Sequence, residues 1–222
     1  MRVSIFKQIS NPILFKQQLL QWAQQFREAV FMDSNEYPQE YSNFDCVLAV
    51  DAFTSVKTDY FNAFEDLKQY QQTTKDWLFG YLSYDLKNDI EVLSSTNFDG
   101  LEFPDLFFFQ PKKIIVLRGN QLEIQYLNMC EDELEDDFNE ITTFQLQTTI
   151  SSSTIAVQQR ISKVNYISKV KAMLDHIHRG DIYEANFCME FFAENAVLNP
   201  IMKFQKLNEI SKPPFAVFLK NN

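Results

Sequence analysis

Short apolar segments follow one another along the middle of the chain, and this order constrains the fold more than any other feature. The segments are rich in β-branched and aromatic residues, which is typical of strands, and cover residues 46–52, 77–84, 106–110, 113–117 and 122–127. Gly119-Asn120 between the last two predicts a hairpin. Strands that succeed one another, instead of alternating with helices, favour antiparallel pairing. We therefore predict an α+β fold of largely antiparallel sheets packed with helices.

Helical spacing of apolar residues marks the segments between and after these strands. Helices are expected over 12–26, 59–70, 131–140, 164–179 and 200–207. Asn11 predicts an N-cap for the first, and Gly180 a left-handed end for the fourth. Strict alternation over 182–191 predicts a strand with one apolar face, and 214–219 predicts another. The acidic segment 131–140 is an amphipathic helix or, alternatively, an acidic interaction tail.

A Thr- and Ser-rich stretch, residues 142–154, separates the strand-rich part of the chain from the rest. Such composition is typical of a linker or an exposed crossover. We therefore expect one domain over 1–150 and the beginning of a second over 151–222.

Composition excludes several classes of function. The chain has 22 Phe but only four Gly among 222 residues, which predicts an aromatic core and disfavours a glycine-rich phosphate loop. A net charge of -10 and a pI near 4.7 argue against a nucleic-acid partner, which needs a clustered basic surface. No run of about 18 apolar residues predicts a membrane span, and no apolar segment follows Arg2 and Lys7 as in a signal peptide. The sequence predicts a cytoplasmic protein without membrane association.

The cysteines and histidines do not form a recognisable site. Cys46, Cys130 and Cys188 are odd in number and widely separated, so they predict buried reduced thiols and neither a disulfide frame nor a zinc site. His176 and His178 fall in the expected last turn of a helix, where positive charge is favourable. A general base or a metal ligand is the alternative reading of these two residues.

Four landmarks along the chain carry a resemblance that composition alone does not give. They are Gly80-Tyr81-Leu82-Ser83-Tyr84-Asp85-Leu86, Phe103-Pro104-Asp105-Leu106, Gly180-Asp181-Ile182-Tyr183-Glu184-Ala185-Asn186, and Pro213-Pro214-Phe215. In this order they resemble the first half of the chorismate-utilising enzymes, and in particular the large subunits of aminodeoxychorismate and anthranilate synthases. The resemblance is strongest after Tyr166.

The resemblance implies an activity that this stretch of sequence does not carry by itself. It implies amination of chorismate to 4-amino-4-deoxychorismate for folate synthesis, with ammonia from a glutamine amidotransferase subunit. The family's Mg²⁺-binding glutamates, nucleophilic lysine and substrate-binding arginine correspond to positions beyond Asn222. We therefore expect no catalytic residue and no metal ligand in this chain, which on this reading is the front half of the enzyme and inactive alone.

The subtype and a ligand pocket are implied by two further segments. Asp33-Ser34 and the segment Tyr41 to Asp45 resemble the aminodeoxychorismate synthases more than the anthranilate synthases. In that family these residues form a tryptophan pocket, which implies the lining Ser34, Tyr41, Ser42, Asn43, Phe44, Pro214, Phe215 and Ala216. Asn43 stands where a basic residue is common, and Ala216 where a small hydroxyl is common. Core packing is the alternative role for this cluster.

Two other functions stay open from the sequence. One is anthranilate synthase component I, the nearest enzyme of the same family. The other is a module without catalysis that binds tryptophan or docks a glutaminase.

Overall fold

A computed structural model of the chain describes residues 1–38, 40, 43–94, 98–146 and 155–221. The chain forms two compact units, one from Met1–Gln147 with Ile201–Asn222 and the other from Thr148–Pro200. None of the described helices is long and apolar enough to cross a membrane.

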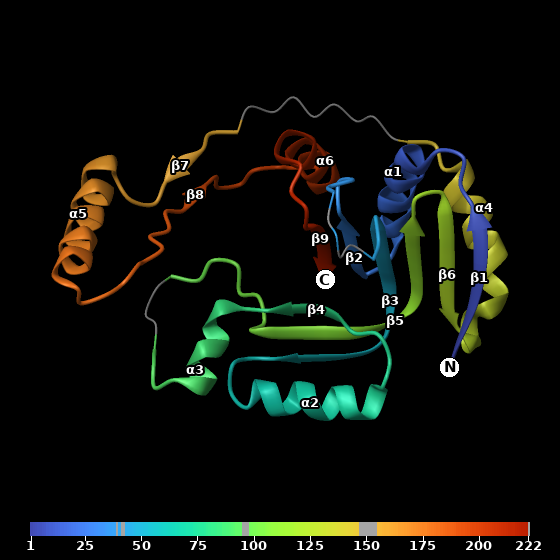
Figure 1. Ribbon diagram of the computed structural model, residues 1–222, viewed down its shortest axis with the longest axis horizontal. Coiled ribbons are helices and arrows are strands. Elements are labelled where there is room, and N and C mark those ends of the chain that lie inside the picture. Colours follow the sequence, from blue (N-terminus) through green and yellow to red (C-terminus); the bar gives the residue numbers. More distant parts are fainter. Residues whose placement is uncertain (39, 41–42, 95–97, 147–154, 222) are drawn as a thin grey trace. The chain divides into compact units, whose positions relative to one another are not determined.

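The first unit is built on a seven-stranded sheet (Figure 1). Its strands are β1 (Arg2–Gln8), β2 (Glu28–Asp33), β3 (Cys46–Thr58), β4 (Phe79–Leu82), β5 (Leu106–Arg118), β6 (Gln121–Leu127) and β9 (Ala216–Asn221). The order is β1-β6-β5-β3-β2-β9, with β4 paired to β5, and every pairing is antiparallel. The predicted α+β fold with antiparallel sheets is confirmed.

The hairpin between β5 and β6 turns where the sequence predicted it. Gly119 has φ +56° there, and its N–H donates to the Asp45 carboxylate. Left-handed backbone of this kind suits glycine, which has no Cβ to clash.

β3 and β5 are long strands that bend part way along, which Figure 1 shows below the main sheet. The sequence predicted two strands where β5 is continuous through Pro111, and the register of β3 with β5 shifts between Ala52 and Thr54. Asp51, at the bend, has φ +61°. Irregularities of this kind bend a ladder and increase its twist.

β4 lies close to β5 at Gly80. A Cβ on Gly80 would lie 1.9 Å from the Phe107 carbonyl oxygen, so only glycine fits there. Phe79 and Tyr81, on either side of Gly80, pack into one apolar cluster with Phe107 and Phe109 of β5.

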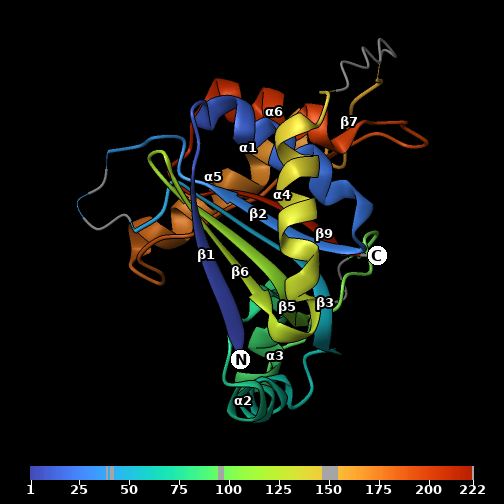
Figure 2. The same ribbon diagram turned by 90° about the vertical axis from the view of Figure 1, so that its right-hand side faces the viewer.

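Three helices cover one face of the sheet: α1 (Pro12–Trp22), α4 (Leu134–Thr143) and α6 (Pro200–Ser211) (Figure 2). The Asn11 side chain caps α1 by accepting from the Leu14 N–H at 3.1 Å, as predicted. Leu134 and Ile141 of α4 are buried, so the acidic segment is an amphipathic helix. The remaining helices of this unit are α2 (Ala63–Thr74), α3 (Lys87–Ile90) and the 3₁₀ turns Ala23–Gln25, Tyr84–Leu86 and Asn128–Glu133.

The opposite face of the sheet has its own apolar cluster. Val47 and Ala49 of β3 point to this side, whereas Cys46, Leu48 and Val50 point to the helices, as the period of two in a strand requires. The rings of Phe79, Phe107 and Phe109 close this second cluster. The Phe-rich composition is thus used to bury both faces of one sheet.

The second unit is smaller and has few buried side chains. It contains α5 (Lys163–Arg179) and the two-residue strands β7 (Gln158–Gln159) and β8 (Phe191–Phe192). Gly180 ends α5 with φ +81°, as predicted, and no residue of α5 is buried. His176 Nδ1 lies 2.7 Å from an Asp181 carboxylate oxygen, in the basic last turn.

Two sequence expectations for this unit are wrong. Residues 182–191 do not form a strand except at Phe191, because in the described part of this unit only Gln158–Gln159 supplies a ladder partner. Cys188 is exposed, whereas Cys46 and Cys130 are buried as expected.

Residues 201–222 return to the first unit. β9 pairs with β2 along its whole length, from Glu28 with Asn221 to Asp33 with Ala216. The compact units therefore divide the chain differently from the expected domains 1–150 and 151–222. As a division into family domains, those boundaries stay a prediction.

Candidate functional site

A cavity of about 350 Å³ opens where β2 ends and β9 begins, on the face of the sheet away from α1 and α4. We call it the strand-end pocket. Its walls come from four separate segments: Met32, Asp33 and Ser34; Asn43 to Val47; Trp77 and Phe79; Pro214 to Val217. The β2–β9 register, which pairs Asp33 with Ala216, brings the first and last of these together.

One side of the strand-end pocket is aromatic. The Trp77 and Phe79 rings are stacked, with centroids 5.9 Å apart, and Phe44 meets Trp77 edge to face at 6.4 Å. Phe215 is 79% exposed at the mouth. Such surfaces suit a flat apolar group that enters from solvent.

The polar side is formed by loop backbone and short side chains. The Ser34 N–H donates to the Asp45 carbonyl at 3.0 Å, and the Tyr37 N–H donates to the Ser34 carbonyl at 3.0 Å. Burial, and then the nearby Asp33 carboxylate, raises the pKa of the Cys46 thiol well above its ordinary value. The Cys46 thiol, which points to the helix side of the sheet, is therefore neutral and not a nucleophile.

Most of the predicted pocket residues meet in this cavity: Ser34, Asn43, Phe44, Pro214, Phe215 and Ala216 all line it. Tyr41 and Ser42 lie outside the described residues. Core packing stays the alternative role, since Ala216 is buried and Phe44 packs against the apolar cluster on this face. That a ligand occupies it stays a prediction.

Sequence reasoning missed Trp77 and Phe79 as wall residues. Both precede Gly80 in the aromatic segment that was assigned only to a strand. What could not be read from the sequence was which face of the sheet they would cover.

Arg118 lies beside the Asn43 position, where the family resemblance had left a basic group missing. Its Nε donates to the Asn43 carbonyl at 3.0 Å, and its guanidinium lies 5.3 Å from the centre of the Phe44 ring. It also forms an ion pair with Glu123 at 2.8 Å. The Arg118 cation, at the end of β5, thus lies next to the pocket wall at Asn43 and is paired with Glu123 of β6.

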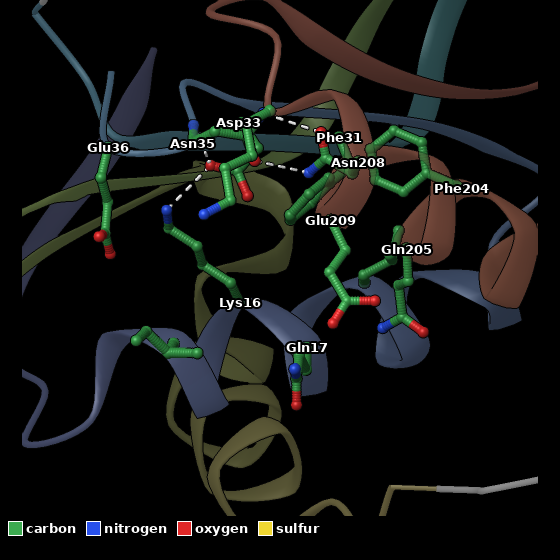
Figure 3. A pocket seen from close by; sticks show the side chains of 13 residues that line it. Lys16, Gln17, Phe31, Asp33, Asn35, Glu36, Phe204, Gln205, Asn208 and Glu209 are labelled. Carbon is green, nitrogen blue, oxygen red and sulfur yellow. Dashed lines mark hydrogen bonds and ion pairs between the residues drawn. The ribbon is translucent and has the colours of Figure 1, made fainter. Parts of the chain in front are cut away.

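A second cavity, of about 310 Å³, lies between α1, the end of β2 and α6. We call it the helix pocket (Figure 3). Lys16 and Asp33 form an ion pair across it at 2.9 Å, with each side chain only 11% exposed. Asp33 therefore lines both cavities.

The residues present do not form a metal centre. Within the described ranges, no group of three or more His, Cys, Asp or Glu side chains is placed to hold a metal ion. We accordingly assign no magnesium ligand to them.

Comparison with known proteins defines the class. Residues 27–222 match the chorismate binding enzyme family, so the chain belongs to the chorismate-binding enzymes. The chain is 27% identical over 154 residues to an anthranilate synthase component I-like protein from Synechocystis sp.. The aligned region covers 65% of this chain and 30% of that protein.

A solved structure shares the fold of the chain. The chain is similar to MenF, the menaquinone-specific isochorismate synthase from Escherichia coli, with a TM-score of 0.55 at 8% identity. This likeness covers 100% of this chain and 48% of MenF. The chain thus spans less than half the length of either relative.

Proposed function

We propose that the protein containing this chain is the large subunit of an aminodeoxychorismate synthase. The observation that carries the proposal is the strand-end pocket, because residues implied by resemblance to that subfamily converge on one cavity from separate segments. The family match over residues 27–222 supports the chorismate-utilising class. In the proposed reaction, ammonia from a glutamine amidotransferase subunit replaces the C4 hydroxyl of chorismate, and water leaves.

The proposal gives this chain a binding role and leaves the chemistry to residues outside it. Magnesium, which in this family offsets the charge of the substrate carboxylate, is proposed to bind outside the described residues. On this proposal the 222-residue chain alone does not turn over chorismate.

We further propose that the strand-end pocket holds tryptophan. Its volume of about 350 Å³ lies at the small end of the usual range for ligand pockets, about 300–1,000 Å³. Trp77 and Phe44 provide ring surfaces for an indole. Ser34 and Asn43 line the pocket and offer polar groups for the ammonium and the carboxylate. Arg118, which donates to the Asn43 carbonyl and is paired with Glu123, lies behind this part of the wall.

Anthranilate synthase component I is the second candidate, and the name of the Synechocystis relative favours it. The two enzymes differ in their products. The first retains the enolpyruvyl group of chorismate, whereas the second releases it as pyruvate.

The test is a product analysis with the complete polypeptide that contains this chain. It is incubated with chorismate, ammonium and Mg²⁺, with and without added tryptophan, and the products are separated by chromatography and mass. Formation of 4-amino-4-deoxychorismate without pyruvate supports the proposal. Anthranilate with an equivalent of pyruvate, inhibited by tryptophan, supports the second candidate. No product from chorismate, together with retained tryptophan binding, supports a module without catalysis and overturns both.

A further inference from the structure

Two asparagine side chains next to the strand-end pocket bind each other without lining it. Asn35 follows Ser34, and Asn208 lies on α6. Their amides exchange two hydrogen bonds, Asn35 Nδ2 to Asn208 Oδ1 at 2.8 Å and Asn208 Nδ2 to Asn35 Oδ1 at 2.7 Å. We call this pair the amide clamp, and Figure 3 shows it beside Asp33.

The amide clamp also binds the backbone just before the wall formed by Pro214 to Ala216. Asn35 Nδ2 donates to the Pro213 carbonyl at 2.6 Å, immediately before Pro214. The β2–β9 ladder ends at the pair Asp33 and Ala216, one residue short of Ser34. The clamp therefore connects the two walls just past the last ladder pair.

The backbone of Asn35 has a left-handed conformation that neighbouring hydrogen bonds stabilise. Its φ is +53°, in the left-handed region that asparagine tolerates better than most residues. Its N–H donates to Asp33 Oδ1 at 2.9 Å, and Lys16 Nζ donates to the same oxygen at 2.9 Å. An uncommon backbone conformation is thus held by a partly buried network. Its members Asn35, Lys16 and Asp33 line the helix pocket, and of these three Asp33 also lines the strand-end pocket.

We propose that Asn35 and Asn208 are positioning residues that set the separation of Ser34 from Pro214 to Ala216, and through it the affinity and selectivity for tryptophan. The ligand in this proposal rests on the proposed function. One expected effect of the clamp does not depend on the ligand. When the clamp is removed, the backbone of the two walls it connects should become more mobile.

The experiment measures tryptophan binding by calorimetry and amide hydrogen exchange in the complete polypeptide. The variants are Asn35→Gly, which keeps the left-handed backbone, Asn208→Ala and the double variant. Glu209→Ala, the next residue on α6, is the matched control because its carboxylate pairs with the exposed Lys206. Each single clamp variant is expected to weaken tryptophan binding by about tenfold, from the loss of a mutual pair of hydrogen bonds.

Two measurements distinguish loss of the clamp from a general loss of stability. They are the tryptophan affinity of the double variant and the selectivity for tryptophan. The double variant should bind no more weakly than the weaker single variant, since either change already breaks the shared pair. The preference for tryptophan over phenylalanine should also narrow, because loosened walls select less for ring size. In hydrogen exchange, segments 32–36 and 213–217 should exchange faster in both single variants than in Glu209→Ala.

Additive losses of affinity in the double variant, or unchanged exchange in both wall segments, would overturn the clamp. If the wild-type protein does not bind tryptophan, the proposed ligand fails. Faster exchange of both walls in the clamp variants would then still support the clamp, and unchanged exchange would overturn it.

Discussion

The helices α4 and α5 carry similar amphipathic patterns but lie in very different surroundings. In α4 the apolar face is buried, with Ile141 0% exposed, whereas in α5 Ile167 and Leu174 are 42% and 44% exposed. The first unit packs α4 against a sheet, whereas the strands of the second unit, among its described residues, are the short pair β7 and β8. An amphipathic pattern therefore identifies which face of a helix is apolar, but not whether a partner covers it.

The largest expected effect is at the buried cation of the first unit. Lys113 is 3% exposed and donates to Glu133 at 2.6 Å and to Asp137 at 2.5 Å, with the Trp22 and Tyr126 rings near its ammonium. Lys113→Met leaves two carboxylates without their cation and should lower the free energy of unfolding by about 3–5 kcal/mol. Urea unfolding followed by circular dichroism measures this loss.

The control for that change is Lys206→Met, because Lys206 forms an exposed ion pair with Glu209 on α6. Exposed pairs contribute less than about 1 kcal/mol, so this variant should unfold almost as the wild type does. Equal effects of the two substitutions would show that the Lys113 cluster is not buried in solution.

The next effect is at the centre of the sheet. Leu48 on β3 is 0% exposed, and Leu48→Ala should lower the free energy of unfolding by about 2–5 kcal/mol through lost burial and the cavity left behind. Thermal unfolding monitored by calorimetry gives the value. A loss below 1 kcal/mol would contradict the packing between β3 and the helices.

A smaller, pH-dependent effect is expected at Asp76. Burial acts to raise its pKa, but hydrogen bonds from Arg2 and Gln110 outweigh burial and hold it below the ordinary 3.8. A lowered folded-state pKa gives stability that is present above the unfolded pKa and lost as the pH falls through the folded one. Asp76→Asn should therefore cost about 1 kcal/mol near neutral pH, and less below pH 3.8.

Urea midpoints of the wild type and of Asp76→Asn, measured from about pH 7 down to pH 3, check the sign of this effect. The two curves should converge toward the acid end. A constant gap across the whole range would mean that the carboxylate charge is not the source of the stabilisation.

The smallest effect is expected in the second unit and sharpens the comparison with α4. Leu174→Ala changes a half-exposed residue of α5, so the free energy of unfolding should change by no more than about 0.5 kcal/mol. Amides of α5 should also exchange with solvent faster than those of β3. A loss near that of Leu48→Ala would show that the apolar face of α5 is covered in solution.

Much of the fold could be predicted because its signals are local. The cap at Asn11, the turn at Gly119 and the helix end at Gly180 each depend on a few neighbouring residues, and each was predicted correctly. The alternation over 182–191 failed because a strand also needs a partner, and a pattern within one segment carries no information about the other.

The strand-end pocket was only partly predictable for the same reason. Ser34, Phe44 and Phe215 were found through resemblance and not through their own chemistry. Trp77 and Arg118 were missed because strand pairing brings them here: Trp77 comes just before β4, which pairs with β5, and Arg118 ends β5. Bends and registers of long strands depend on contacts between residues far apart in the chain.

Neighbouring residues were enough to predict the class of fold, the turn at Gly119, the helix ends at Asn11 and Gly180, and the apolar faces of the expected helices. The return of β9 to β2 after the second unit, which brings Pro214 to Ala216 against Ser34, depends on the folded sheet. Local conformations cost little entropy to form and are specified by neighbouring residues. A pocket assembled across a long loop forms only when the summed burial of the sheet offsets the entropy of closing that loop.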